Sequence, residues 1–151
     1  VALDGRLLNI LRWHVYPHFG KAVALEIASD GRCLSFDHAI DFPGGMTKFT
    51  ILRHPETGLY WSLVNRVTKP DAAGMRSVLT LVKSADLEHW TPVRDLLRDD
   101  RDTAVRYTGF QYVDWLFDGP DILAASRTAF NGAHNFHDAN YLTFHRVRDF
   151  A

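Results

Sequence analysis

A nine-residue stretch near the C-terminus gathers side chains that could act on a substrate. The segment from Gly132 to Asn140 carries two histidines, one aspartate and two asparagines. Its Asp138, together with the earlier Asp114, supplies carboxyl groups that could work as a general acid and base. The three glutamates of the chain fall mid-strand or in short turns. We therefore expect Asp138 and Asp114 to be the catalytic candidates.

A second set of residues has side chains that suit anions and hydroxyl groups. Arg76 and Arg127 could each bind a carboxylate through paired hydrogen bonds, and Lys48 is similar. The alternative is that these cations form ion pairs between neighbouring structural units. The other predicted substrate-binding residues are polar side chains of the same regions. They are Arg66, Gln111, Tyr112, His134, His137 and Asn140.

Metal and cofactor chemistry finds little support in the chain. His134, His137 and Asp138 have a spacing that permits a metal site, but loop histidines are more often solvated or hydrogen-bonded than ligating. Cys33 is the only cysteine, so no internal disulfide and no cysteine-based zinc site is expected. No phosphate-binding glycine loop or nucleophile elbow appears. We expect no metal and no cofactor.

The elements that must position these residues are strands. Short runs of β-branched and aromatic residues alternate with Gly, Pro, Asp and Asn throughout the chain. The runs are Leu7 to Val15, Ala22 to Ala28, Cys33 to Phe42, Lys48 to Arg53, Leu59 to Val67, Ser77 to Lys83, Trp90 to Leu97, Phe110 to Phe117, Ile122 to Thr128 and Tyr141 to Val147. Only the segment from Asp99 to Arg106 could form a turn or two of helix. The pattern predicts an all-β protein.

The strands also repeat as a unit. Two similar hairpins begin 62 residues apart, at Lys48 and Phe110, and each is followed by a longer polar connection and a third strand. A four-stranded antiparallel unit repeated about every 50 to 60 residues is typical of a β-propeller, which closes with about 4 to 8 blades. We predict about half of a five- or six-bladed propeller: an incomplete blade at 1–45, a complete blade at 46–98 and a final blade at 107–151. A self-contained β-sandwich is the alternative.

Connections within a blade alternate between the two ends of the central channel. The short connections contain Asp30, Glu56 and Asp86, and the other set is generally longer and chemically richer. Function tends to lie in long loops that a rigid scaffold positions. We therefore expect the site at the long-connection end, and structural roles for the three acidic residues of the short turns.

One short connection has a recognisable pattern. In Ser84-Ala85-Asp86-Leu87-Glu88-His89-Trp90-Thr91, the Ser and Asp side chains can bond backbone N–H groups while the Trp covers the hairpin. This turn resembles the Asp-box of sialidase-like β-propellers, although it is one residue shorter and lacks the usual glycine. The segments from Gly109 to Trp115 and from His134 to Asn140 resemble the corresponding part of bacterial sialidase-like proteins.

The resemblance implies a glycoside hydrolase that removes terminal sugars from glycans. In such propellers arginines bind carboxylates and paired carboxyl groups perform acid and base catalysis. The expected partners are a glycan or oligosaccharide substrate and the remaining blades of the same polypeptide. A non-catalytic propeller that binds glycans or proteins through the same face is the alternative, because one fold hosts both roles.

Charge and hydropathy exclude two other classes of partner. The chain has 17 basic and 18 acidic residues, a net charge of -1, and no long run of either sign. We therefore expect no nucleic acid as a partner. No apolar stretch reaches the roughly 18 to 20 residues that span a bilayer, so no membrane partner is expected. The localisation stays open, with a secreted or periplasmic protein as one alternative.

Overall fold

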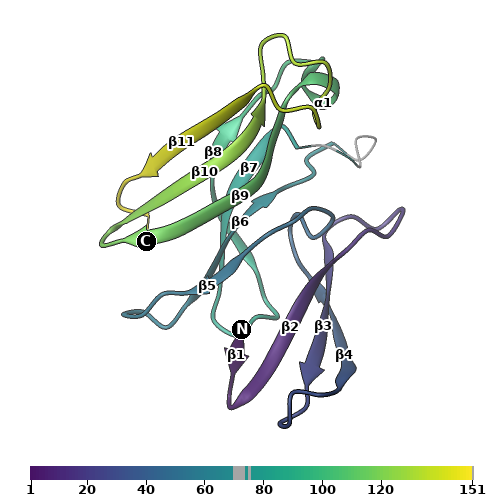
Figure 1. Cartoon of the computed structure of the whole chain (residues 1–151), viewed down its shortest axis with the longest axis vertical. Coiled ribbons are helices and arrows are strands. Elements are labelled where there is room, and N and C mark those ends of the chain that lie inside the picture. Colours follow the sequence, from purple (N-terminus) through teal and green to yellow (C-terminus); the bar gives the residue numbers. More distant parts are fainter. Residues whose placement is uncertain (70–73, 75, 151) are drawn as a thin grey trace.

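The computed structural model describes residues 1–69, 74 and 76–150, and it is all-β (Figure 1). These residues form three antiparallel sheets that follow one another along the chain. The N-terminal sheet contains β1 (Ala2–Leu3), β2 (Arg6–Trp13), β3 (Lys21–Ile27) and β4 (Leu34–Asp41). The middle sheet contains β5 (Ile51–Arg53), β6 (Tyr60–Asn65), β7 (Val78–Ser84) and β8 (Thr91–Arg98). The C-terminal sheet contains β9 (Gly109–Asp118), β10 (Asp121–Ala129) and β11 (Tyr141–Val147).

Each sheet is a simple meander, because every strand pairs with its neighbour in the sequence. The predicted all-β class and all ten predicted strand runs are confirmed, with shifted ends. The helical expectation shrinks to one turn, α1 (Ala104–Tyr107). The two-layer sandwich alternative is not what the structure shows, since three sheets pack in chain order.

Two strand boundaries differ from the prediction for local reasons. The N-terminal sheet gains β1, because Asp4 and Gly5 both adopt positive φ, 49° and 79°, and close a two-residue hairpin where only a turn was expected. The strand expected from Lys48 starts only at Ile51. The carbonyl of Thr50 instead accepts hydrogen bonds from the Ser62 hydroxyl at 3.0 Å and the Trp115 indole at 3.3 Å.

The middle sheet is buried on both faces, which is why β6 and β7 consist almost wholly of buried residues. Tyr60, Val64 and Val82 face the N-terminal sheet, and the alternate residues face the C-terminal sheet. The first interface also contains Leu8, Ala22, Ala24, Ile40, Phe42, Leu87 and Trp90. The second contains Trp61, Leu63, Leu79, Leu81, Phe110, Trp115, Ile122, Ala124, Val147 and Phe150.

The turn between β7 and β8 has the predicted hydrogen bonds. Asp86 accepts from the backbone N–H groups of Glu88 and His89 at 2.9 and 2.8 Å, and the Ser84 hydroxyl accepts from that of Leu87 at 2.9 Å. Leu87 takes the left-handed conformation, with φ 65°, that a glycine would adopt more readily. The indole of Trp90 donates to the Leu87 carbonyl at 2.9 Å, so the tryptophan does cover the hairpin.

Candidate functional site

The longer connections meet at one end of the middle and C-terminal sheets. The connection from β10 to β11 lies beside α1 at the top of the C-terminal sheet (Figure 1), where the Phe136 N–H donates to the Arg106 carbonyl at 2.7 Å. The segment just before β7 reaches the same place. Arg76 forms a β-bridge to Gly109, and its backbone carbonyl accepts a hydrogen bond from the Phe110 N–H at 2.9 Å. Residues from separate connections can therefore contact one another here.

Tyr112 lies at the centre of this region in an unusual backbone conformation. Its φ is 50°, a left-handed value that costs an aromatic residue roughly 1 to 3 kcal/mol. Tyr112 and Val113 together oppose Ser126, because the register of β9 and β10 shifts between the Ala125 and Arg127 pairs. Such a bulge redirects a side chain out of the strand alternation. The Tyr112 hydroxyl lies 3.3 Å from Nε2 of His137.

Three cationic side chains surround the Tyr112 ring. Nζ of Lys48 lies 5.0 Å from the ring centroid, Cζ of Arg127 lies 5.1 Å away and Cζ of Arg76 lies 5.9 Å away. These distances are within cation–π range. In the part of the chain that the structure describes, none of the three cations forms an ion pair with a carboxylate. Among the described residues, the ion pairs between sheets that were the alternative for these cations are therefore not seen.

A buried glutamine holds the cluster together. Gln111 is only 1% exposed, and its amide nitrogen donates to the carbonyls of Phe136 and His137, the latter at 3.2 Å. Its amide oxygen accepts a hydrogen bond from the Arg76 guanidinium. Arg76 also lies over the Phe136 ring, with Cζ 5.4 Å from the centroid. Gln111 thus fixes Arg76 against the loop that carries His137.

The loop is stabilised by its own polar residues. Asn135 accepts the backbone N–H groups of His137 and Asp138 at 2.7 and 3.0 Å, and it donates to the Asp138 carboxylate at 2.7 Å. Nδ1 of His134 lies 3.1 Å from the same carboxylate. The hydrogen bond with His134 is the largest cause that lowers the pKa of Asp138. Asp138 is therefore ionised at neutral pH, as a base or nucleophile would be and a general acid would not.

Two predicted binding residues have scaffold contacts instead. Arg66 donates to both oxygens of Asp95, at 3.0 and 3.2 Å, so it joins β6 to β8 inside the middle sheet. Burial raises the pKa of Asp95, but the hydrogen bonds from Thr80, Arg98 and Arg66 outweigh it and lower the pKa overall. Asn140 exchanges two hydrogen bonds with the backbone of Phe130, at 2.8 and 3.0 Å, and closes the base of the loop.

Asp114 is exposed on the face of β9 that points away from the middle sheet. Its carboxylate accepts the N–H of its neighbour Trp115 at 3.1 Å, and no described contact joins it to the Tyr112 cluster. Among the described residues, no group of three His, Cys, Asp or Glu side chains could hold a metal ion. Of the predicted residues, the structure thus brings together Lys48, Arg76, Gln111, Tyr112, Arg127 and His137.

Phe136, a long-loop aromatic of the kind expected to stack on a sugar ring, is also a neighbour of the cluster, because Arg76 lies over its ring. No helix in the described part of the chain is long and apolar enough to cross a membrane. Comparison of the chain with protein families, with curated proteins and with solved structures finds no match in any of the three.

Proposed function

We propose that this chain forms consecutive blades of a five- or six-bladed β-propeller that acts on carbohydrates and resembles sialidase-like glycoside hydrolases. Three meander sheets in chain order, each packed on the next through an apolar face, support this architecture. The long connections gather at one end of the sheets, and loops held by a rigid scaffold are where substrate-binding residues tend to lie.

The observation that carries the proposal is the set of three cations around Tyr112. Three positive charges within 6 Å of one ring centroid repel one another, and no described carboxylate offsets them. An anionic ligand removes that cost on binding. The arginine fork suits a carboxylate, which it can bind through two parallel hydrogen bonds. The preferred ligand is therefore a sugar that carries a carboxylate, with His137 and Tyr112 offering hydrogen bonds to its hydroxyl groups.

The proposed reaction is hydrolysis of the bond that links this terminal sugar to a glycan. One carboxylic acid protonates the leaving oxygen, while a second group attacks or stabilises the oxocarbenium-like centre. The lowered pKa of Asp138 suits the second role. Gln111 acts through Arg76 as a positioning residue.

Glycan binding without hydrolysis is the second candidate function. Hydrolysis needs a carboxyl group that keeps its proton near neutral pH, and such groups usually have a raised pKa. The pKa of Asp138 is lowered instead, and Asp114 has no described contact with the cluster. These two observations favour binding without hydrolysis.

Calorimetric titration of the chain with sialic acid, glucuronic acid and the neutral methyl glucoside tests the ligand class. We expect the two acids to bind and the neutral sugar not to. Arg127→Gln and Lys48→Gln remove exposed cations and should each weaken binding by about 5- to 10-fold, at roughly 1 to 1.4 kcal/mol per charged contact. Arg32→Gln is the matched control, because Arg32 is exposed on the β3–β4 turn. Equal affinity for acidic and neutral sugars would contradict the proposal.

A second assay separates the two candidate functions. Aryl-glycoside and sialoside panels are incubated with the wild type, Asp138→Asn and Asp114→Asn. Turnover that falls in one variant while the affinity for the acidic sugar is retained supports hydrolysis by that carboxylate. Acid-sugar binding with no turnover in the wild type supports the binding function, and unchanged turnover in both variants eliminates both carboxylates as catalysts.

A further inference from the structure

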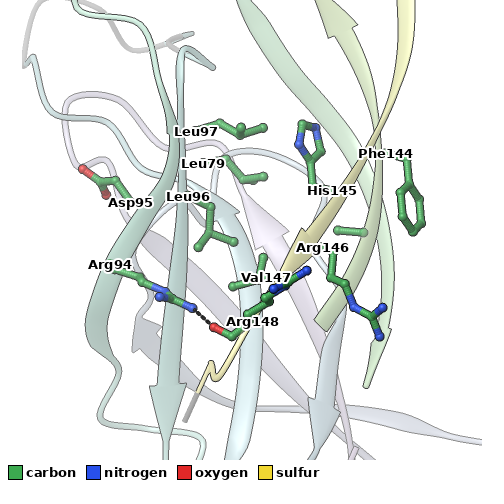
Figure 2. A pocket seen from close by; sticks show the side chains of 11 residues that line it. Leu79, Arg94, Asp95, Leu96, Leu97, Phe144, His145, Arg146, Val147 and Arg148 are labelled. Atoms are coloured by element: carbon green, nitrogen blue, oxygen red, sulfur yellow. Dashed lines mark hydrogen bonds between the residues drawn. The ribbon is translucent and has the colours of Figure 1, made fainter. Parts of the chain in front are cut away.

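The C-terminal sheet has an open edge beside a groove. The N-terminal and middle sheets each end in a fourth strand, β4 and β8, whereas β11 pairs only with β10 among the described residues. A groove of about 620 Å³ separates β11 from β8 (Figure 2). The unpaired backbone N–H and C=O groups of an edge strand are a template for another strand.

The groove extends the buried interface between the middle and C-terminal sheets. Its floor includes Leu79, Ala124 and Val147, which are members of that interface, and Leu96 and Leu97 pack against it while only partly buried. The apolar side chains of β8 are therefore covered on one side only. Burying them further would add hydrophobic stabilisation of the kind that already joins the two sheets.

The β11 wall of the groove carries a histidine. Figure 2 shows His145 of β11 pointing into the space between the strands, and its Nε2 lies 2.8 Å from the Thr143 hydroxyl. Burial lowers the pKa of His145, so the ring is neutral. Phe144, the preceding residue of β11, also lines the groove.

The lower rim carries positive charge that no described carboxylate neutralises. Arg94 and Arg148 are both exposed, and the Arg94 guanidinium donates to the Arg148 carbonyl at 3.0 Å. Arg146 differs, because it pairs with Asp118 and Asp121. The charge complement of this rim is therefore a carboxylate.

We propose that this edge and groove bind an extended acidic segment of a partner protein, which adds to the C-terminal sheet as a fourth strand beside β11. The backbone of the segment pairs with β11, and its alternate side chains are apolar and cover Leu96 and Leu97. Its carboxylates lie at the rim, next to Arg94 and Arg148.

The chain itself supplies a probe peptide of this chemistry. The β4 sequence, residues 34–41, has apolar side chains at Leu34, Phe36 and Ile40 and carboxylates at Asp37 and Asp41. We expect a labelled peptide of this sequence to bind the chain with a Kd below about 1 mM. It should protect the β11 amides from hydrogen exchange. A peptide of the same composition in scrambled order is the first control.

Charge-reversal variants then locate the site. Arg148→Glu and Arg94→Glu should each weaken binding of the peptide at least about 5-fold. Arg32→Glu makes the same charge change on the β3–β4 turn, and this variant should bind the peptide as the wild type does. Failure to bind at 1 mM, equal binding of the scrambled peptide, or equal loss in Arg32→Glu would overturn the proposal. So would β11 amides that are already protected in a dimer of the free chain, because the edge would then hold a second copy.

Discussion

The substitution Gly109→Ala should uncouple the loop of the candidate site from its scaffold. Gly109 begins β9 and is buried, and a Cβ atom there would lie 2.2 Å from the Phe136 carbonyl oxygen. Real Cβ contacts of this type are essentially never below 3.0 Å, so the loop must move by roughly 1 Å. That movement breaks the hydrogen bond from Gln111 to the same carbonyl.

The size of the effect follows from these two contacts. Overpacking a tight site costs about 1 to 3 kcal/mol, and the loss of a buried hydrogen bond costs about 1 kcal/mol more. We therefore expect Gly109→Ala to lower the unfolding free energy by about 2 to 4 kcal/mol. Binding of the acidic sugar should weaken too, because Gln111 no longer holds Arg76 against the loop.

Urea denaturation followed by tryptophan fluorescence measures the first effect, and titration with sialic acid measures the second. Gly74→Ala is the matched control, since among the described residues its Cβ would meet the end of the Phe136 ring, at an ordinary 3.7 Å. We expect the control to change stability by less than about 0.5 kcal/mol. If the two variants unfold at the same urea concentration, the argument that Gly109 sets the position of the loop is wrong.

Three further predictions concern the scaffold. Trp90→Ala should lower the unfolding free energy by about 3 to 5 kcal/mol in urea denaturation, because a buried tryptophan that packs on Phe42 is lost. A decrease in unfolding free energy below about 1 kcal/mol would contradict this. Asp86→Asn should cost about 1 kcal/mol near pH 6, where the native pKa of Asp86, lowered mainly by the His89 N–H, keeps its carboxylate ionised. This difference should shrink as the pH falls below about 4, since a depressed carboxyl pKa stabilises the fold only above the unfolded value, and a constant difference from pH 6 to 3 would refute it. The chain should associate at high concentration through its outer sheet faces, where Phe36 and Phe144 are each 68% exposed. Changing both residues, Phe36→Lys with Phe144→Lys, should reduce the sedimentation coefficient. A wild type that sediments as a monomer would show that the faces do not associate.

Features that depend on neighbours in the sequence were predictable. The turn from Ser84 to Trp90 forms from hydrogen bonds that span two or three residues, so its residue types were enough to predict it. The strand runs follow from short stretches of β-branched and aromatic residues bounded by Gly, Pro, Asp and Asn. The expectation that the long connections share one end of the sheets also required only antiparallel pairing, which reverses the chain at every turn.

Roles that depend on which residue meets which were not predictable. Arg66 and Arg76 flank the same connection and look equivalent in the sequence, yet Arg66 meets Asp95 while Arg76 meets Gln111. The difference depends on where β8 shifts its register against β7, next to Asp95. A shift of one residue moves a side chain to the other face of a sheet, and the sequence pattern does not reveal it.

The sequence by itself therefore determined the all-β class, the order of the strands and the group of residues at one end of the sheets, because each depends on short-range patterns. The tertiary structure decided which of those residues form a cluster. Lys48, Arg76 and Arg127 come from three separate segments and meet only because two sheets pack face to face and a bulge turns Tyr112 toward them. Contacts between segments this distant in sequence depend on packing and register, which no local pattern records.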